Sequence, residues 1–209
     1  MPFTVTRVVI AGTFSLDGQD FAVENNVWVI GDDDGLIVVD AAHDAPKIAE
    51  VVNHRRVHAI VCTHGHNDHV NAAPALSELV TAPVYLSLAD RMLWDVVHPG
   101  LAPYDDLRAG DSFAIAGEEL HVLPTPGHSP GGICLYAPGP GLLFSGDTLF
   151  RGGPGATGRS YSDFPTILDS ISTSLLTLPS PTVVHPGHGE DTTIGAEAGG
   201  YDEWVARGH

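Results

Sequence analysis

The chain has 209 residues, 43% of them hydrophobic, and carries a net charge of -17 with only 9 Lys and Arg. Its length and composition predict one compact domain, residues 1–209, with a large core. The negative charge argues against binding to nucleic acid or to an anionic membrane surface, because phosphate groups would be repelled.

The sequence shows neither a signal-peptide pattern nor an apolar run of membrane-spanning length, so we expect a cytoplasmic protein. Cys62 and Cys134 each lie in an apolar run and form no close-spaced pair. We therefore expect both to be small buried side chains in a reducing compartment, with no disulfide framework.

The first half of the chain alternates predicted strands with predicted helices. β-Branched and aromatic residues, separated by Asp and Gly turns, predict strands at residues 3–10, 21–30 and 36–39. A proline placed for a first turn predicts a helix from about Pro46. The pattern then predicts a buried strand, a helix, a short strand and another helix, at residues 57–61, 71–79, 84–86 and 88–97.

The second half continues in the same manner. Strands are expected at residues 110–115, 119–123, 133–136, 142–144 and 182–185, the first two paired across a turn at Gly117. A helix is expected over residues 163–176, with Ser162 or Asp163 as its cap. This succession predicts β-sheet with helices packed outside it, a fold of the α/β class.

Four potential metal ligands, His64, His66, Asp68 and His69, follow directly after the buried strand at 57–61. On an extended segment, residues two apart point the same way, so His64 and His66 are placed to hold one ion. Asp68 and His69 are neighbours that diverge from this pair and suit a second ion. The stretch therefore predicts half of a two-metal site.

An apolar strand followed by a short turn with Gly or Pro and a potential ligand occurs three more times. These turns carry His128, Asp147 and His188. If the strand ends converge on one edge, they bring all seven candidate ligands together. A carboxylate can bridge two cations, and Asp147 stands alone on its turn, so we expect it to be the bridge. The other histidines lack ligand spacing and are interpreted as surface or structural residues: His43, His54, His58, His98, His121, His185 and His209.

The order of these motifs, HxHxDH, then a PGH loop, SGDTLF and HPGHG, resembles the metallo-β-lactamase superfamily. Within it, the chain is most similar to the glyoxalase II-like hydrolases, over nearly its whole length. The resemblance implies a four-layer αβ/βα sandwich, with two mixed β-sheets flanked by helices and metals at the sheet edges. It also implies a first metal held by His64, His66 and His128, a second held by Asp68, His69 and His188, Asp147 bridging the two, and Asp40 as a carboxylate that orients a ligand imidazole.

By analogy with glyoxalase II, the resemblance implies hydrolysis of a thioester of a small cellular thiol. Two divalent ions would lower the pKa of a bridging water, and the resulting hydroxide would attack the carbonyl. Asp68 and Asp147 are the candidate catalytic residues, because Asp68 is placed to hold this nucleophile and Asp147 to bridge the ions. Histidine-rich ligation with two carboxylates suits two Zn2+, and iron or manganese is also compatible.

Two departures from glyoxalase II bear on the substrate. Those enzymes have a longer helical region after the last ligand, and a lysine at the position of Ala156. We therefore expect a conjugate of another thiol, such as mycothiol or bacillithiol. Arg151 and Arg159, at the ends of a glycine-rich loop, are candidate contacts for a substrate carboxylate.

Three alternatives remain open. A persulfide dioxygenase shares much of the pattern but uses a single iron, and a lactonase of the same fold keeps all seven ligands. The chain is alternatively a metal-binding module without catalysis, which the full ligand set argues against. β-Lactam hydrolysis is disfavoured, because that branch typically lacks an Asp at the position of Asp68 and is exported. The sequence leaves the oligomeric state open.

Overall fold

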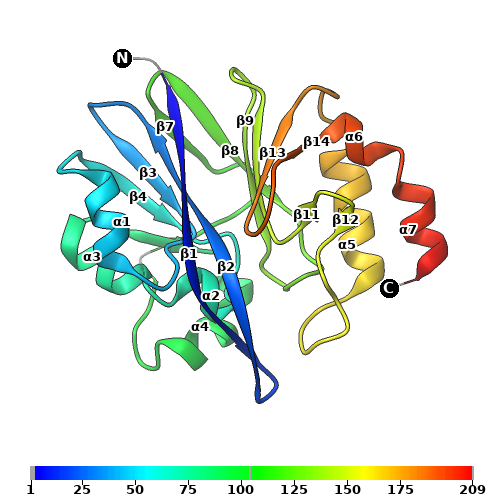
Figure 1. Cartoon of the computed structure of the whole chain (residues 1–209), viewed down its shortest axis with the longest axis horizontal. Coiled ribbons are helices and arrows are strands. Elements are labelled where there is room, and N and C mark those ends of the chain that lie inside the picture. Colours follow the sequence, from blue (N-terminus) through cyan, green and yellow to red (C-terminus); the bar gives the residue numbers. More distant parts are fainter. Residues whose placement is uncertain (1–2, 104, 209) are drawn as a thin grey trace.

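The computed structural model describes residues 3–103 and 105–208, so His209 lies outside the described residues. Within these ranges the strands form two large mixed sheets and one small hairpin (Figure 1). The first sheet is antiparallel from β1 to β3 and parallel from β3 to β6. In spatial order its strands are β1 (Thr4–Leu16), β2 (Gln19–Gly31), β3 (Leu36–Val39), β4 (Val57–Val61), β5 (Val84–Leu86) and β6 (Asp105–Asp106).

The second sheet is formed by the second half of the chain. Its β10 and β13 are parallel, whereas its other neighbouring strands are antiparallel. Its strands lie in the order β14 (Thr192–Thr193), β13 (Val183–Pro186), β10 (Leu142–Gly146), β9 (Ile133–Ala137), β8 (Glu118–Pro124) and β7 (Ser112–Ile115). The small hairpin pairs β11 (Leu149–Phe150) with β12 (Gly153–Pro154).

Helices cover the outer faces of both sheets, and Figure 1 shows the resulting four layers. The helices of the first half lie outside the first sheet: α1 (Ala45–Val52), α2 (Asn67–Val70), α3 (Ala73–Val80), the short 3-10 turn η1 (Leu88–Asp90) and α4 (Arg91–Val97). Those of the second half lie outside the second sheet: α5 (Phe164–Ser170), the π-helical turn η2 (Ile171–Leu175), α6 (Ile194–Ala198) and α7 (Tyr201–Arg207). None of the helices in the described ranges has both the length and the apolar character needed to cross a membrane.

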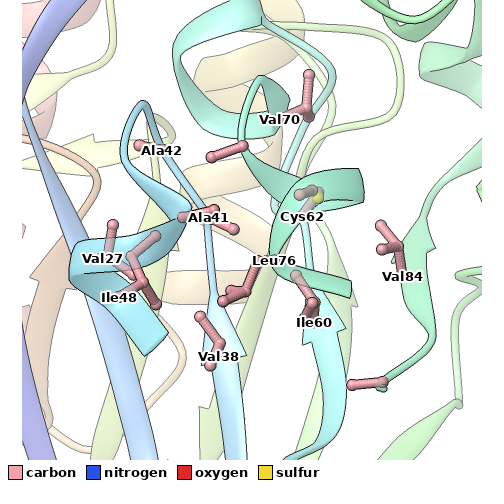
Figure 2. Close-up of a cluster of buried hydrophobic side chains, with 14 of the residues drawn as sticks. Val27, Val38, Ala41, Ala42, Ile48, Ile60, Cys62, Val70, Leu76 and Val84 are labelled. Atoms are coloured by element: carbon pink, nitrogen blue, oxygen red, sulfur yellow. The ribbon is translucent and has the colours of Figure 1, made fainter. Parts of the chain in front are cut away.

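Alternating side chains on the central strands build separate hydrophobic clusters on the two faces of each sheet. On β3, Val38 packs toward α1 and α3, whereas Val39 packs between the sheets. Figure 2 shows the cluster under the first helices, where Ile48 of α1 and Leu76 of α3 meet Ile60 of β4. A third cluster lies between the second sheet and its helices. The predicted α/β sandwich with two mixed sheets flanked by helices is confirmed.

The first strand is much longer than the sequence pattern predicted, whereas the second extends only slightly beyond the predicted residues 21–30. They pair without interruption from Thr4 with Gly31 to Leu16 with Gln19, and form the arm at the bottom of Figure 1. The predicted strand at residues 3–10 stopped too early, because residues 11–16 alternate between exposed and partly exposed positions and lack an apolar run. A local signal was present: Asp17 and Gly18, with φ of 54° and 72°, form the two-residue turn that suits a hairpin.

The segment after the strand 57–61 also differs from the prediction. The spacing argument placed His64 and His66 on an extended segment, whereas the chain bends after Cys62 and enters α2 at Asn67, with His66 as the residue before the helix. The predicted helix at 71–79 corresponds to α3, which begins at Ala73 with proline in its first turn, two residues after the predicted start. The separate short helix α2, at Asn67–Val70, precedes it and was not predicted.

Candidate metal centre

The seven candidate ligands lie at strand ends that meet at one edge of the two sheets. The bend and α2 after β4 carry His64, His66, Asp68 and His69. Strands β8, β10 and β13 of the second sheet run in the same direction, and the turns that follow them carry His128, Asp147 and His188. The predicted convergence of these side chains is thus present in the fold.

One group of side chains consists of His64, His66 and His128. Nδ1 of His66 lies 3.0 Å from Nε2 of His128, and the His64 ring centre lies 4.8 Å from that of His66 and 5.0 Å from that of His128. Nδ1 of His128 lies 2.8 Å from the carbonyl oxygen of Ala156, which leaves Nε2 directed at the group. These are the residues predicted for the first metal.

A second group consists of Asp68, His69 and His188. Nε2 of His188 lies 3.4 Å from Oδ2 of Asp68 and 3.2 Å from Nε2 of His69. Nδ1 of His188 lies 2.7 Å from the carbonyl oxygen of Glu24, which directs Nε2 inward. These are the residues predicted for the second metal.

Asp147 lies between the two groups. Its Oδ2 is 3.6 Å from Nε2 of His128 and 3.5 Å from Nε2 of His188, and its Oδ1 is 3.5 Å from Nε2 of His69. A carboxylate that faces imidazoles of both groups has the position required of a bridge between two cations.

Several polar atoms of this cluster are buried without a hydrogen-bond partner. They are Nε2 of His64, Nε2 of His66, Oδ1 of Asp68 and Oδ1 of Asp147. Buried polar atoms are normally paired, because an unpaired one loses its hydration without compensation. Neutral imidazole nitrogens and carboxylate oxygens are ligands for divalent cations, so a His and Asp metal site fits these residues.

Asp40 hydrogen-bonds to His69 of the second group and to Thr63, which directly precedes His64 of the first group. It follows β3 with a φ of 56°, and its Oδ2 lies 2.9 Å from Nδ1 of His69 and accepts the Thr63 hydroxyl at 2.8 Å. Its Oδ1 accepts the Thr63 backbone N–H at 2.7 Å. A carboxylate on Nδ1 directs Nε2 of His69 toward Asp68 and Asp147, which is the orienting contact predicted for Asp40.

Two histidines of the first group, His64 and His66, are poised to be neutral. Burial, reinforced by His128, lowers the pKa of His66 to about 3. Burial, reinforced by His69, lowers the pKa of His64 well below its usual range. Neutral imidazoles have a free lone pair for a cation at pH 7.

The second group and the bridge have the opposite electrostatics. Burial opposes ionisation of Asp147, but the charges of His69 and His188 outweigh it and hold its pKa well below the usual range. Burial opposes protonation of His188, but Asp147 and Asp68 outweigh it and raise the His188 pKa to about 10. The carboxylates are therefore charged and paired with protonated imidazoles, whose protons a divalent cation would displace.

Asp90 is a buried residue of this region that the sequence analysis missed. Its Oδ2 accepts the Gly65 N–H at 2.8 Å and the Ser129 hydroxyl at 2.6 Å, and its Oδ1 accepts the Gly131 N–H at 2.5 Å. It therefore ties the loop between His64 and His66 to the loop that carries His128. Its position shortly after the end of β5, a strand parallel to β4, was an available signal.

His43 was interpreted as a surface or structural residue, and the structure shows that it contacts a neighbour of the candidate ligands. Its Nε2 lies 2.9 Å from Oδ1 of Asn25, and the Asn25 amide donates to Oδ2 of Asp68 at 3.1 Å. Neither residue belongs to a ligand motif, and no spacing in the sequence links them to Asp68.

A cavity of about 540 Å³ opens beside His66, between the tip of the β1–β2 hairpin and α4. Apolar side chains that include Leu16, Leu93, Val96 and Tyr161 line it. The carboxyl-bearing residues Asp17 and Asp20 also border it, and its lining includes neither lysine nor arginine among the described residues.

Both candidate substrate arginines make contacts within the chain. The Arg151 guanidinium donates from Nη2 to the carbonyl oxygen of Asp191 at 2.6 Å. The Arg159 guanidinium lies 4.4 Å from the centre of the Phe21 ring and donates to Oε1 of Gln19 at 3.3 Å. Arg159 thus packs against the hairpin near its tip, whereas Arg151 is held beside Asp191, directly before β14. Their role in substrate binding stays a prediction.

Residues 21–188 match the family model described as the metallo-beta-lactamase superfamily. The "Probable metallo-hydrolase YqgX" of Bacillus subtilis is 34% identical over 186 residues, which cover 82% of this chain and 88% of that protein. The "Hydroxyacylglutathione hydrolase GloC" of Haemophilus influenzae is 30% identical over 192 residues, which cover 84% of this chain and 91% of that protein.

Two solved structures resemble the whole sandwich. The BLEG-1 B3 metallo-beta-lactamase superposes with a TM-score of 0.76 at 30% identity. TTHA1623, in a di-iron-bound form, superposes with a TM-score of 0.75 at 32% identity. Each superposition covers 91% of this chain and 97% of the other.

Proposed function

Because the chain belongs to the metallo-β-lactamase superfamily of metal-dependent hydrolases, we propose that its reaction is the hydrolysis of a thioester of a small thiol. One observation carries the proposal. Candidate ligands from both halves of the chain converge, and several of their own buried polar atoms have no hydrogen-bond partner among the described residues. The likeness to a hydroxyacylglutathione hydrolase supports the thioester as the bond that is cleaved.

Two cations would be held by the two groups of residues described above. His64, His66 and His128 would hold one, Asp68, His69 and His188 the other, with Asp147 facing both. We propose Zn2+ for both positions, since imidazole and carboxylate ligands suit it, while iron or manganese is compatible. When bound, such a pair supplies a Lewis acid for the carbonyl and makes a water molecule acidic enough to attack near neutral pH.

Asp68 is the residue best placed to handle the proton of the attacking water. Its Oδ1 is buried and has no hydrogen-bond partner, whereas its Oδ2 is engaged by Asn25. Oδ1 would accept the hydrogen bond of the water and orient its oxygen toward the carbonyl carbon. The water oxygen would then bond to that carbon while a water proton passes to Oδ1 of Asp68, the carbon–sulfur bond would break, and the leaving thiolate would take up that proton.

The cysteines are not suited to act as nucleophiles. Cys62 is buried among the apolar side chains under α1 and α3, and Cys134 is buried against the second sheet's helices (Figure 2 shows Cys62). Burial raises the pKa of Cys134 to about 11 and that of Cys62 well above its usual range. Both stay protonated thiols at pH 7, so attack by water is favoured over a covalent acyl intermediate on sulfur.

The cavity beside His66 is the proposed position of the substrate. Leu16, Leu93 and Val96 offer an apolar wall, and the nearby carboxylates of Asp17 and Asp20 disfavour an anionic ligand. Glutathione carries two carboxylates at neutral pH, and Ala156 contributes only its carbonyl oxygen, which is bound to His128. We therefore propose a thiol with less negative charge than glutathione.

A panel of substrates tests this function. Protein loaded with zinc is assayed with hydroxyacyl thioesters of glutathione and of uncharged thiols, with lactones, and with a β-lactam, alongside elemental analysis. We expect turnover of the thioesters, fastest with the uncharged thiol, and loss of that turnover in His66→Ala. His121→Ala is the matched control, since His121 is a partly exposed residue of β8 outside the cluster.

Some results would overturn the proposal. Failure to cleave any thioester, or thioester cleavage that survives in His66→Ala, would contradict it. Faster turnover of lactones or the β-lactam would assign the centre to another hydrolysis. Oxygen uptake with a persulfide, together with one iron per chain, would replace hydrolysis by a dioxygenase reaction.

A further inference from the structure

We propose that Asn71, His43 and Asn25 form a hydrogen-bonded relay that positions Asp68 for cation binding. The three residues come from the end of α2, the loop before α1, and the middle of β2. They converge on Asp68 from outside the cluster of candidate ligands. The relay makes them positioning residues, because none of them would contact a cation or substrate itself.

The relay is continuous from a backbone amide to the carboxylate. The His43 backbone N–H donates to Oδ1 of Asn71 at 2.6 Å, and Nδ2 of Asn71 lies 2.9 Å from Nδ1 of His43. On the other side of the ring, Nε2 of His43 lies 2.9 Å from Oδ1 of Asn25. Nδ2 of Asn25 then donates to Oδ2 of Asp68 at 3.1 Å.

The backbone amide fixes the direction of every bond in this relay. A backbone N–H can only donate, so Asn71 must turn its oxygen toward it and its NH2 toward Nδ1 of the His43 ring. Nδ1 must therefore accept, and the ring proton is on Nε2, which donates to the oxygen of Asn25. Asn25 is left with its NH2 facing Asp68. Reversing any one amide would oppose two donors or two acceptors.

This direction matters because Asn25 is fully buried beside the cluster. An asparagine that was free to flip would present either its oxygen or its NH2 to Asp68, and only the NH2 stabilises a carboxylate. The donor occupies one lone pair of Oδ2, the oxygen that lies 3.4 Å from Nε2 of His188. The carboxylate is therefore held with a defined rotation, as a ligating carboxylate requires.

The backbone around His43 is adapted to place the ring. His43 has a φ of 58°, in the left-handed region that non-glycine residues rarely occupy. A β-carbon at Gly12 of β1 would overlap the His43 ring, so the strand leaves space for the imidazole at this position. The half-buried ring therefore lies close against the backbone at Gly12 and is hydrogen-bonded to the two asparagines.

His43 could instead have a purely structural role, as a link between the hairpin and the loop before α1. Substitutions of His43 distinguish this role from the relay. His43→Asn tolerates the left-handed backbone better than His43→Gln does, but its side chain is too short to reach Asn25. Gln retains both a donor and an acceptor at greater length. A relay therefore ranks Gln above Asn in cation binding, whereas backbone strain alone ranks Asn above Gln.

The experiment measures the affinity of each variant for zinc by competition with a chelator, and the absorption spectrum of the cobalt-loaded protein. We expect His43→Asn to weaken binding of the second cation about 10- to 100-fold while the first is retained, and His43→Gln to recover part of the loss. Gly12→Ala removes no polar group but displaces the His43 ring, so it should weaken binding of the same cation. His121→Asn is the matched control.

The proposal rests on the proposed two-cation function, and Asp68→Ala separates the two failures. If the native chain binds fewer than two cations, the proposed two-cation function is wrong, and if Asp68→Ala binds two cations as tightly as the native chain, Asp68 is not a ligand and the proposed second group is wrong. If Asp68→Ala loses the second cation but His43→Asn and Gly12→Ala do not, the relay is overturned and the centre stands. If His43→Gln binds no better than His43→Asn, the role of His43 is structural and the relay is overturned. Should His43→Asn fail to fold, unchanged affinity in Gly12→Ala overturns it.

Discussion

Replacing Asp90 by asparagine should both destabilise the fold and weaken cation binding by the first group of candidate ligands. Asp90 is buried and accepts hydrogen bonds from Gly65, Ser129 and Gly131, so it ties together the loops that carry His64, His66 and His128. Asparagine has nearly the same shape, so the change removes acceptor capacity without opening a cavity.

The magnitude follows from counting donors. Two backbone N–H groups and one hydroxyl face the two oxygens of Asp90 on opposite sides. In either orientation of an asparagine amide, its NH2 faces one of the backbone N–H groups, so one buried donor stays unpaired at a cost of about 1–3 kcal/mol. Burial raises the pKa of Asp90 in spite of its three donors, so removing the buried charge offsets part of this cost. We therefore expect a loss of about 1–2 kcal/mol at pH 7.

Urea unfolding of the zinc-free proteins measures this loss, and chelator competition measures the affinity for zinc. Asp95→Asn is the matched control, because Asp95 lies on α4 one turn away and its ion pair with Arg91 is exposed. That change should alter stability by no more than about 0.5 kcal/mol. Asp90→Ala, which leaves all three donors unpaired, should cost more than Asp90→Asn.

The reasoning fails if Asp90→Asn unfolds at the same urea concentration as the native chain. It also fails if that variant is destabilised but binds both cations with native affinity, because the tie between the two loops would then be irrelevant to the site.

Three further outcomes are expected. Asp147→Asn replaces the carboxylate that faces both groups, so elemental analysis after dialysis should find less than half the native cation content, and native content would contradict the bridging position. Gly187→Ala should weaken cation binding in chelator competition without altering a candidate ligand, because its β-carbon would overlap the Asp147 carboxylate; Gly199→Ala, with open space around the added carbon, should bind normally. The stability of the metal-free protein should be greatest near pH 6.5, about the ordinary histidine value. In the folded state the pKa of His66 is about 3, so its contribution to stability is lost as the pH falls from the ordinary histidine value toward 3. The pKa of His188 is about 10, so its contribution to stability is lost as the pH rises from the ordinary histidine value toward 10. A monotonic dependence in urea unfolding at several pH values would contradict this.

The apolar runs of the central strands predicted β-sheet with helices packed outside it, whereas the four-layer sandwich with two mixed sheets was implied by the family resemblance. Strand β4 is observed at the predicted residues, and β3 likewise. The outer part of the arm formed by β1 and β2 was missed because it is largely exposed to solvent and carries no run of apolar residues. Only the turn residues Asp17 and Gly18 indicate it in the sequence. The short helices α6 and α7 also had no predicted counterpart.

The convergence of the candidate ligands was predicted correctly, since each follows an apolar strand and parallel strands end at the same edge. Their function as ligands stays a prediction. Asp90, Asn25 and His43 could not be found in this way, because each acts through a partner 18 or more residues distant and carries no motif. Polar contacts of this kind are determined by packing, which only the three-dimensional arrangement reveals.

The candidate ligands are divided between the two sheets, and neither half of the chain has a complete group. The first group needs His128 from the second half, and the second group needs His188. Capture of cations therefore adds to the association of the halves, which the apolar cluster between the sheets also provides. If the chain is cut within the exposed residues 108–111, between β6 and β7, the two fragments should associate more tightly with zinc than in chelator, so that the ions have a structural as well as a chemical role.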